Sequence, residues 1–491
     1  MPFPVFGSNS AVAGYLINNS LRLDSASSNC GLSRFGNNSR NGNTFTISFW
    51  VKRCNIGARS QLVNSKVEDS GVNSMYMEFR SDDKISVIGQ PASGSGAGSN
   101  RTVLQTNAVF RDPSAWYHIV YRQDTTQSTA SDRHRLYVNG IEQSLQTNDA
   151  LDQNVAFAYW YNASSYPYNI GNDERDNIYA DIYMAEHHYT DGVSNAPTEF
   201  GETNENGVWI PKEYTGSHGS YGHYLKFDNS DGGSGTTSIG GHSFTTGSSS
   251  TIGADSSGNG NHFHIQGYDT VDQTTDTPTN NFCTLNPLDN KSGDTYSEGN
   301  TGIATVDSGD SPSRSTFSLT NGKWYWEVKR TSAGSPDLSL GVMEQSEAFA
   351  DLLGSTAKGY GYYSANGNKY NNGSNSSYGN SYTNGDIIGI ALDMDNGVIW
   401  FSKNGTWQNS ATQAEIEAGT TTNSAFTGIS GTISPAISDG GTGSSTAQFN
   451  FGKPPFSISS GNSDANGYGN FEYAVPSGYY ALCTKNLAEY G

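Results

Sequence analysis

The pattern of apolar and polar positions along this chain predicts short β-strands. In the segment 44–53, apolar side chains fall on every second position, at Phe45, Ile47, Phe49 and Val51. This alternation is typical of a strand with one buried face. Similar short runs at 115–121, 135–138 and 181–186 are each followed by polar residues or turn residues. No run approaches 18 apolar residues, so the pattern predicts no ordinary membrane-spanning helix.

The clearest prediction concerns residues 385–407, which have the pattern of a hairpin with a third strand attached. An apolar run over 387–392 is followed by Asp395, Asn396 and Gly397, which tolerate a positive φ, and then by the β-branched and aromatic segment 398–401. Asn404 and Gly405 turn the chain a second time. Such residues between apolar runs favour tight hairpin turns.

Around this hairpin, the order of the motifs resembles the SPRY domain. The segment GKWYWEV (322–328) precedes it and FNFGKPPF (449–456) follows it. The resemblance runs from about Phe282 to the C-terminus. It implies a concanavalin-like β-sandwich that serves recognition rather than chemistry.

The first half of the chain resembles the laminin-G-like or concanavalin-A-like lectin module over residues 21–191. The segments that carry the likeness are TFTISFWVKR, AWYHIVY, RLYVNG and DIYMAE. Both halves contain a strand that ends in an Asn-Gly turn, at 139–140 and at 404–405. We therefore expect an all-β chain of two tandem concanavalin-like antiparallel β-sandwiches of the jelly-roll type, joined by a Gly/Ser-rich segment.

These resemblances divide the chain into four parts. Residues 1–20 would form either an arm that docks onto another protein or an edge strand of the first sandwich. The lectin domain would cover 21–228, a Gly/Ser/Thr-rich connecting segment 229–278, and the SPRY domain with a C-terminal extension 279–491. Residues 229–253 are almost all Gly, Ser, Thr and Asn, a composition typical of a flexible surface loop or linker.

The joining segment and the C-terminus resemble parts of marine bacteriophage virion proteins that carry a lectin-like module followed by a SPRY module. The residues concerned are DSSGNGN (255–261), TNNFCTLNPL (279–288) and YYALCTKNLAEYG (479–491). The resemblance implies a tail fibre, spike or head fibre that recognises host-surface receptors, chiefly glycans. It also implies other virion proteins as partners, a host cell-surface glycan or protein as the ligand, and a homo-oligomer, with the trimer as the usual form for fibres. A structural capsid or tail decoration protein and a polysaccharide depolymerase are the alternatives.

Composition and charge narrow the possible partners. Hydrophobic residues make up 34% and charged residues 15%, while Gly numbers 58 and Tyr 29, so neutral side chains supply most of the polarity. With 27 Lys and Arg against 47 Asp and Glu, the net charge is −20. Such a chain would be repelled by a phosphate backbone or an anionic membrane, so neither nucleic-acid binding nor membrane insertion is expected.

The N-terminus and the cysteines give information about the compartment in which the protein is made. No basic residue precedes Arg22 and no long apolar core follows, so residues 1–20 do not have the pattern of a signal peptide. We expect a virion protein assembled in the host cytoplasm. The four cysteines, Cys30, Cys54, Cys283 and Cys483, are widely spaced without a CxxC pair and are expected as small buried side chains.

Motifs for catalysis are missing from the sequence. It contains no Gly-x-Ser-x-Gly, no His-Glu-x-x-His, no phosphate-binding GxxxxGK[ST] and no Glu-x-Asp-x-x-Glu of the glucanase type. Asp181 and Glu186 are five residues apart on one expected strand, which should point them to opposite faces. A calcium loop at Asp393 fails because Asn404 stands where a bidentate Glu is needed. We therefore expect no enzyme, no catalytic residue and no cofactor.

Five of the nine histidines fall between His218 and His264. The pair His262 and His264 would share one face of a strand, so a metal shared at a symmetry axis is one alternative. A polar, solvated face is the favoured one.

Aromatic side chains are the favoured binding residues. The 25 residues from Lys358 to Tyr382 contain six Tyr, six Asn, five Gly and five Ser, the residue types of antibody paratopes. A second aromatic cluster lies at 159–168. The candidate ligand-binding residues are Tyr159, Trp160, Tyr161, Tyr166, Tyr168, Tyr360, Tyr362, Tyr363 and Tyr382. The alternative is that many of these rings, with Tyr370 and Tyr378, belong to the scaffold.

Overall fold

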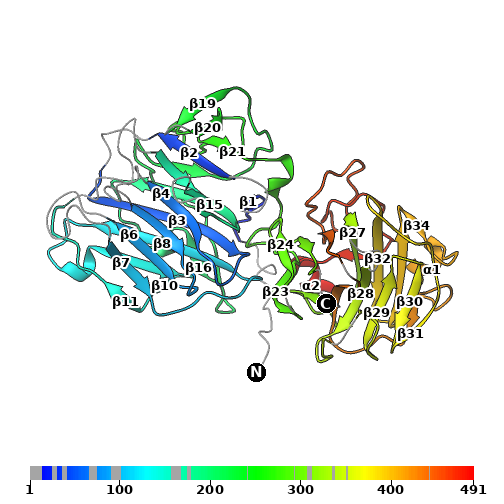
Figure 1. The fold of residues 1–491 in the computed structure, drawn as a ribbon. Helices are drawn as coiled ribbons and strands as arrows, with labels where there is room; N and C mark the ends of the chain where they lie inside the picture. The colour runs from blue at the N-terminus through cyan, green and yellow to red at the C-terminus, as the bar shows by residue number, and fades with distance from the viewer. Residues whose placement is uncertain are drawn as a thin grey trace. The chain divides into compact units, whose positions relative to one another are not determined.

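The computed structural model describes residues 14–24, 30–35, 41–65, 75–89, 101–155, 167–173, 178–239, 242–291, 293–306, 312–333, 338–349, 352–441 and 443–491. These residues form two compact units, one ending at Thr279 and one beginning at Asn280. Both are built from antiparallel sheets, with a few short helical turns (Figure 1). The expected all-β class, with concanavalin-like sandwiches, is confirmed.

The first unit contains two large sheets. The first sheet has the strand order β10 (Ile141–Glu142), β9 (His134–Val138), β8 (Trp116–Asp124), β3 (Thr44–Arg53), β15 (Ile182–Asp191), β1 (Ser20–Leu23) and β22 (Gln273–Thr274), and β18 (His223–Leu225) also pairs with β15. The second sheet has the order β11 (Leu145–Asn148), β7 (Arg101–Thr106), β6 (Ile85–Gly89), β5 (Met75–Phe79), β4 (Ser60–Ser65), β12 (Pro167–Ile170), β2 (Gly31–Phe35), β21 (His264–Gln266), β20 (His242–Thr245) and β19 (Thr236–Ile239).

Strand β3 is buried on both faces. Its alternating residues Phe45, Ile47, Phe49 and Val51 lie in the core of the sandwich, as the sequence predicts. The opposite face of β3 is covered too, because Trp50 packs with Ile17, Trp116 and Tyr183 in a separate cluster. The residues around 14–17 and 196–214 therefore form a layer over the outer face of the first sheet.

The segment expected as a connector, 229–278, is instead part of the first unit. Strands β19, β20 and β21 extend the second sheet, and β22 pairs with β1 in the first. Three large apolar side chains of this segment, Ile252, Phe263 and Ile265, lie in the core. Large apolar side chains are few in this Gly/Ser/Thr-rich stretch and the alternation at 262–265 is short, which explains why the composition suggested a linker.

Two buried ion pairs also hold this segment. Lys52 Nζ lies 2.6 Å from Asp276 Oδ2, and Arg22 lies 3.3 Å from Asp272 Oδ1. The indole N–H of Trp116 donates to Asp276 Oδ1 at 3.2 Å. Because β1 lies between β15 and β22, residues 20–23 are not an edge strand. Residues 1–13, most of the expected arm, lie outside the described residues.

The second unit also contains two sheets. The first has the order β23 (Leu285–Asn290), β26 (Ser313–Ser315), β36 (Ile433–Asp439), β28 (Leu338–Glu344), β29 (Gly359–Tyr363), β30 (Asn368–Asn371) and β31 (Ser374–Ser377). The second has the order β24 (Thr295–Ser297), β25 (Gly302–Ala304), β37 (Ser445–Asn450), β27 (Lys323–Ala333), β32 (Ile387–Asp393), β33 (Val398–Lys403) and β34 (Thr406–Trp407), with β35 (Phe426–Thr427) on β33 and β38 (Tyr480–Ala481) on β27.

The predicted three-stranded element at 385–407 is present. Strand β32 pairs with β33, and β33 pairs with β34. The turn residues Gly397, Asn404 and Gly405 have φ values of 63°, 48° and 77°. These positive values explain the Gly at the first turn and the Asn-Gly pair at the second.

The C-terminal extension and helix α1 (Gln413–Glu417) cover the outer face of the second sheet of this unit. Tyr325, Trp400 and Ile416 pack there with Phe471 and Tyr479. The buried carboxylate of Glu327 accepts the backbone N–H groups of 472 and 473, and its burial raises its pKa above the ordinary value. The chain ends in α2 (Thr484–Tyr490).

The four cysteines are small buried side chains, as the sequence predicts. In the described parts of the chain, no helix is long and apolar enough to cross a membrane.

Candidate functional site

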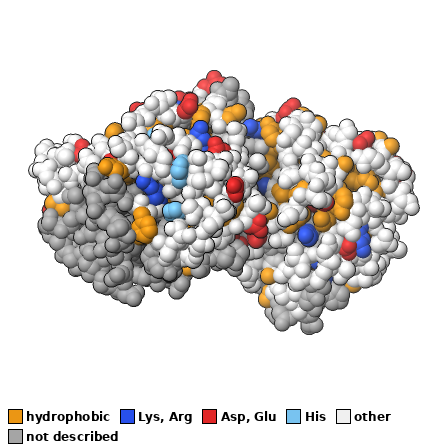
Figure 2. Space-filling view, turned by 90° about the horizontal axis from the view of Figure 1, so that it is seen from above, with side chains coloured by type: hydrophobic (Ala, Val, Ile, Leu, Met, Phe, Trp, Pro, Cys, Tyr) orange, Lys and Arg blue, Asp and Glu red, His pale blue; other side chains and the backbone are white. Residues whose placement is uncertain are grey.

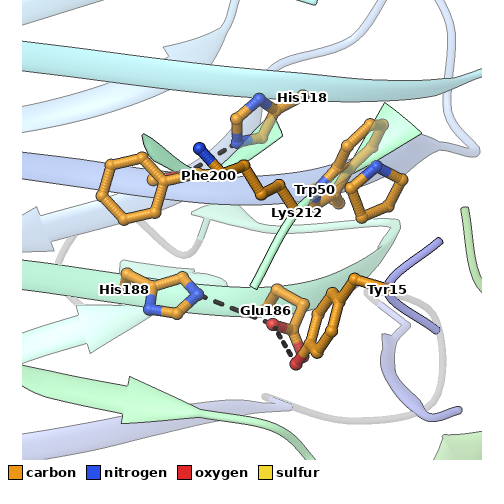
Figure 3. A pocket seen from close by; sticks show the side chains of 9 residues that line it. Tyr15, Trp50, His118, Glu186, His188, Phe200 and Lys212 are labelled. Carbon is orange, nitrogen blue, oxygen red and sulfur yellow. Dashed lines mark hydrogen bonds and ion pairs between the residues drawn. The ribbon is translucent and has the colours of Figure 1, made fainter. Parts of the chain in front are cut away.

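A shallow depression on the outer face of the first unit brings together several side chains suited to chemistry. Its empty volume is about 180 Å³. It is lined by Tyr15, Ser48, Trp50, His118, Glu186, His188, Phe200, Pro211 and Lys212. Figure 3 shows Glu186 between His188 and Tyr15, with His118 and Trp50 on the neighbouring strands.

A β-bulge in β15 places Glu186 in this depression. Ala185 pairs with Trp50 and His188 pairs with Ser48, so β15 advances by three residues while β3 advances by two. Glu186 has a φ of 50°, which is uncommon for a residue with a side chain and marks local strain. His187 packs inward on Phe49. The alternation that predicted opposite faces for Asp181 and Glu186 therefore does not apply, because Glu186 itself lies in the bulge between Ala185 and His188.

The carboxylate of Glu186 is bound by two phenols. Tyr224 donates to Glu186 Oε2 at 2.6 Å and Tyr15 at 3.1 Å, and the two phenol oxygens are 2.8 Å apart. Burial, together with the nearby carboxylate, raises the pKa of both tyrosines. These phenols stay protonated and donate hydrogen bonds, so the carboxylate acts as their acceptor.

Two histidine pairs flank the bulge. On the outer face, His188 Nδ1 lies 3.1 Å from His218 Nε2. In the core, His187 Nδ1 lies 3.1 Å from His223 Nε2, and the two rings are stacked. Burial lowers the pKa of His187 to about 3 and that of His218 to about 4, and it holds the pKa of His223 well below 6.5. These three rings are neutral at pH 7.

Ser48 and His118 have the distance of a nucleophile and its base, yet their hydrogen bonding does not fit catalysis. Ser48 Oγ lies 2.8 Å from His118 Nε2. The indole N–H of Trp209 donates to His118 Nδ1 at 3.0 Å, so Nδ1 is the acceptor and Nε2 carries the hydrogen. His118 then donates to Ser48 and cannot remove its proton. Burial also lowers the pKa of His118 to about 3.

The alternative of a metal at His262 and His264 does not fit the contacts. His262 Nδ1 accepts the backbone N–H of Asp255, and His264 Nδ1 accepts that of Gly247. Within the described residues, no three His, Cys, Asp or Glu side chains are arranged to hold a metal ion. His262 and His264 are therefore used in internal hydrogen bonds.

The structure places four of the five described candidate tyrosines in the two cores. Tyr168 is fully buried beside His187, and the three others that lie in a core are Tyr360, Tyr362 and Tyr382. These rings are not presented to a ligand, because strand packing uses them. Tyr159, Trp160, Tyr161 and Tyr166 lie outside the described residues.

Among the candidate ligand-binding residues that the structure describes, Tyr363 is partly exposed. It follows Tyr362 on β29, and successive side chains of a strand point to opposite faces. Its ring pairs with that of Tyr370 on β30 at 5.0 Å between centroids. Tyr370, expected as scaffold, is also partly exposed. The alternation of side chains along the strand GYGYY could have predicted from the sequence that Tyr363 lies on the opposite face from Tyr360 and Tyr362.

Replacing Tyr362 by Ala should destabilise the second unit by about 3–5 kcal/mol, because it empties a buried aromatic site. Its ring packs on Tyr378, Tyr382 and Phe401. Tyr362→Phe keeps these contacts and loses only the hydrogen bond to the Asn380 carbonyl, at a cost of about 0.5–1.5 kcal/mol. Urea unfolding measures both. Equal stability of Tyr362→Ala and the wild type would contradict the core placement.

Comparison with known proteins agrees with this division into two sandwiches. Residues 27–195 match the model of the Concanavalin A-like lectin/glucanases superfamily, and residues 323–454 match that of the SPRY domain. The chain therefore carries a concanavalin-like lectin domain followed by a SPRY domain. Domains of the laminin-G and SPRY types typically bind rather than catalyse, so these matches indicate a binding or adhesion module.

Solved structures of two human SPRY domains are similar to part of this chain. The SPRY domain of human HERC1 has 19% sequence identity, covers 34% of this chain and 96% of its own, and gives a TM-score of 0.29. A second human SPRY domain has 17% identity, covers 32% of this chain and 96% of its own, and gives a TM-score of 0.24.

Proposed function

We propose that this chain is a non-catalytic adhesion protein on the surface of a bacteriophage particle, in a tail fibre, spike or head fibre, and that it binds a receptor on the host envelope. The observation that carries the proposal is the succession of a lectin-like and a SPRY domain in one chain. The resemblance of 255–261, 279–288 and 479–491 to marine phage virion proteins supports the location.

The state of the polar residues supports binding without chemistry. Glu186, His118 and the two histidine pairs are engaged in internal hydrogen bonds. Figure 2 shows a face on which neutral atoms predominate and charged side chains are scattered. Such a surface suits ligands that are recognised by neutral hydrogen bonds and apolar contact.

Purified protein should bind susceptible bacteria and block adsorption of the phage that carries it. A decoration protein would leave adsorption unchanged, and a depolymerase would release reducing sugar from the envelope. A panel of strains treated with the intact chain separates these outcomes. Absence of both cell binding and adsorption block would overturn the proposal.

We also propose that the working form is a homo-oligomer with other virion proteins as partners. Copies that act together gain avidity from weak single sites. Binding to cells should therefore weaken by about 10²-fold or more when the chain is diluted to a monomer. The mass of the cell-bound species, measured by light scattering after gentle elution, checks this. A monomeric mass with full affinity would contradict it.

A further inference from the structure

One exposed face of the second unit combines aromatic rings with amides and lacks charge. The register of β29, β30 and β31 sets Gly361, Tyr370 and Asn375 side by side, and likewise Asn368 and Ser377. Residues in direct register share a face. Tyr363 joins this face, because it lies two positions from Gly361 on β29.

The other face of the same strands is used for packing. Lys369 lies opposite Tyr362 and Ser376, and its Nζ donates to the carbonyl of Ala425. Burial lowers the pKa of Lys369. The one charged side chain of these three strands thus points away from Tyr363 and Tyr370.

The rings of Tyr363 and Tyr370, both partly exposed, are held in place. Their centroids are 5.0 Å apart with planes at 60°. A Cβ at Gly354 would come within 2.6 Å of Tyr370 Cβ, so the loop 352–356 lies directly against this strand. A rigid aromatic side chain loses little conformational entropy on binding.

Two amides complete the face. Asn368 Nδ2 donates to Asn375 Oδ1 at 3.0 Å. One such bond uses a single N–H and a single lone pair, so the two amides keep further donors and acceptors. Asn375 and Ser377 are exposed. The face therefore offers an aromatic surface beside neutral hydrogen-bonding groups.

We propose that the face formed by Tyr363, Asn368, Tyr370 and Asn375 binds a neutral oligosaccharide. This inference rests on the proposed adhesion function and names its ligand class. A sugar ring has an apolar side that stacks on aromatic rings and hydroxyls that pair with amides. Seven residues of the three strands point to this side, and none is charged. Gly359 and Gly361 are buried against the loop 352–356, whereas Tyr363, Asn368, Tyr370, Asn375 and Ser377 are partly or fully exposed. An acidic glycan would find no cation there and would face a chain of net charge −20.

The test screens the intact chain on an array of neutral and acidic oligosaccharides and titrates the best neutral one by calorimetry. Tyr363→Ala and Tyr370→Ala should each weaken binding by about 5-fold to 150-fold, and Asn375→Ala by a smaller factor. Ser376→Ala, on the opposite face of β31, is the matched control and should keep wild-type affinity. Thermal unfolding verifies that every variant is folded.

The outcomes separate the two proposals. If the wild type binds cells or sugars and the tyrosine variants bind equally well, this site is wrong and the adhesion function stands. Binding to acidic glycans alone also overturns it. Binding that is lost only with Ser376→Pro would indicate an extended peptide added along the edge strand β31. If the intact chain binds neither cells nor any oligosaccharide, both proposals fail.

Discussion

Lowering the pH from 7 towards 4 should unfold the first unit. Four histidines have a pKa depressed by burial: His118 and His187 to about 3, His218 to about 4, and His223 well below 6.5. The unfolded chain takes up protons near pH 6.5 while the folded chain does not, so the free energy of unfolding falls as the pH falls below 6.5. Above pH 6.5 this contribution is fully present.

The expected effect is large. Each such histidine contributes a slope of about 1.4 kcal/mol per pH unit. Four together give about 5 kcal/mol per pH unit, against a typical total stability of about 5–15 kcal/mol. The groups near them do not cancel this effect, since Arg34 further lowers the pKa of His223, and Asp255 only partly opposes the shift of His218.

Urea unfolding of the intact chain at pH 7, 6, 5 and 4.5 measures this slope. The double variant His187→Phe, His223→Phe should remove about half of it. His187 stacks on Phe49 and His223 meets Phe263 edge to face, and rings of similar shape can stay there. The number of protons that the wild type takes up on unfolding gives an independent count of the histidines that are neutral in the folded state. A stability that stays constant between pH 7 and 4.5 would contradict the buried, neutral state of these rings.

Replacing Asp276 by Ala should destabilise the first unit by about 3–5 kcal/mol. The change leaves Lys52 buried without its carboxylate partner, 2.6 Å away in the wild type, and an unpaired buried charge is costly. It also removes the acceptor of the Trp116 indole N–H. Protease should then cut near 270–279, because this ion pair ties the segment to β3.

The control for Asp276→Ala is the double variant Lys52→Met, Asp276→Leu. Replacing a buried ion pair by apolar side chains of similar size is often neutral or stabilising. The double variant should therefore recover most of the lost stability. If both variants are as stable as the wild type, the segment 270–279 is held by other contacts.

The sequence predicts most of the fold because its signals are local. The alternation in 44–53 and the turns at 395–397 and 404–405 specify strands and hairpins without knowledge of distant residues. Residues 229–278 gave only a weak signal, the short alternation at 262–265, because their few core residues, such as Ile252, join a core formed by distant strands. The ion pairs at Asp272 and Asp276 are equally non-local.

The candidate sites could be predicted only in part. Counting tyrosines in 358–382 indicates a binding surface but does not say which rings are exposed. Strand register decides this, since it places Tyr362 in the core and Tyr363 beside Tyr370. The bulge at Glu186 depends on how β15 pairs with β3, so no local pattern could reveal it.

The central claim is that the chain binds envelope sugar without cleaving it. Size-exclusion chromatography of the intact chain, after incubation with surface polysaccharide from a susceptible strain, tests this directly. The account predicts that the protein elutes with the polymer and that the polymer keeps its length. Shortened polymer would show a depolymerase, and separate elution of protein and unchanged polymer would contradict sugar binding.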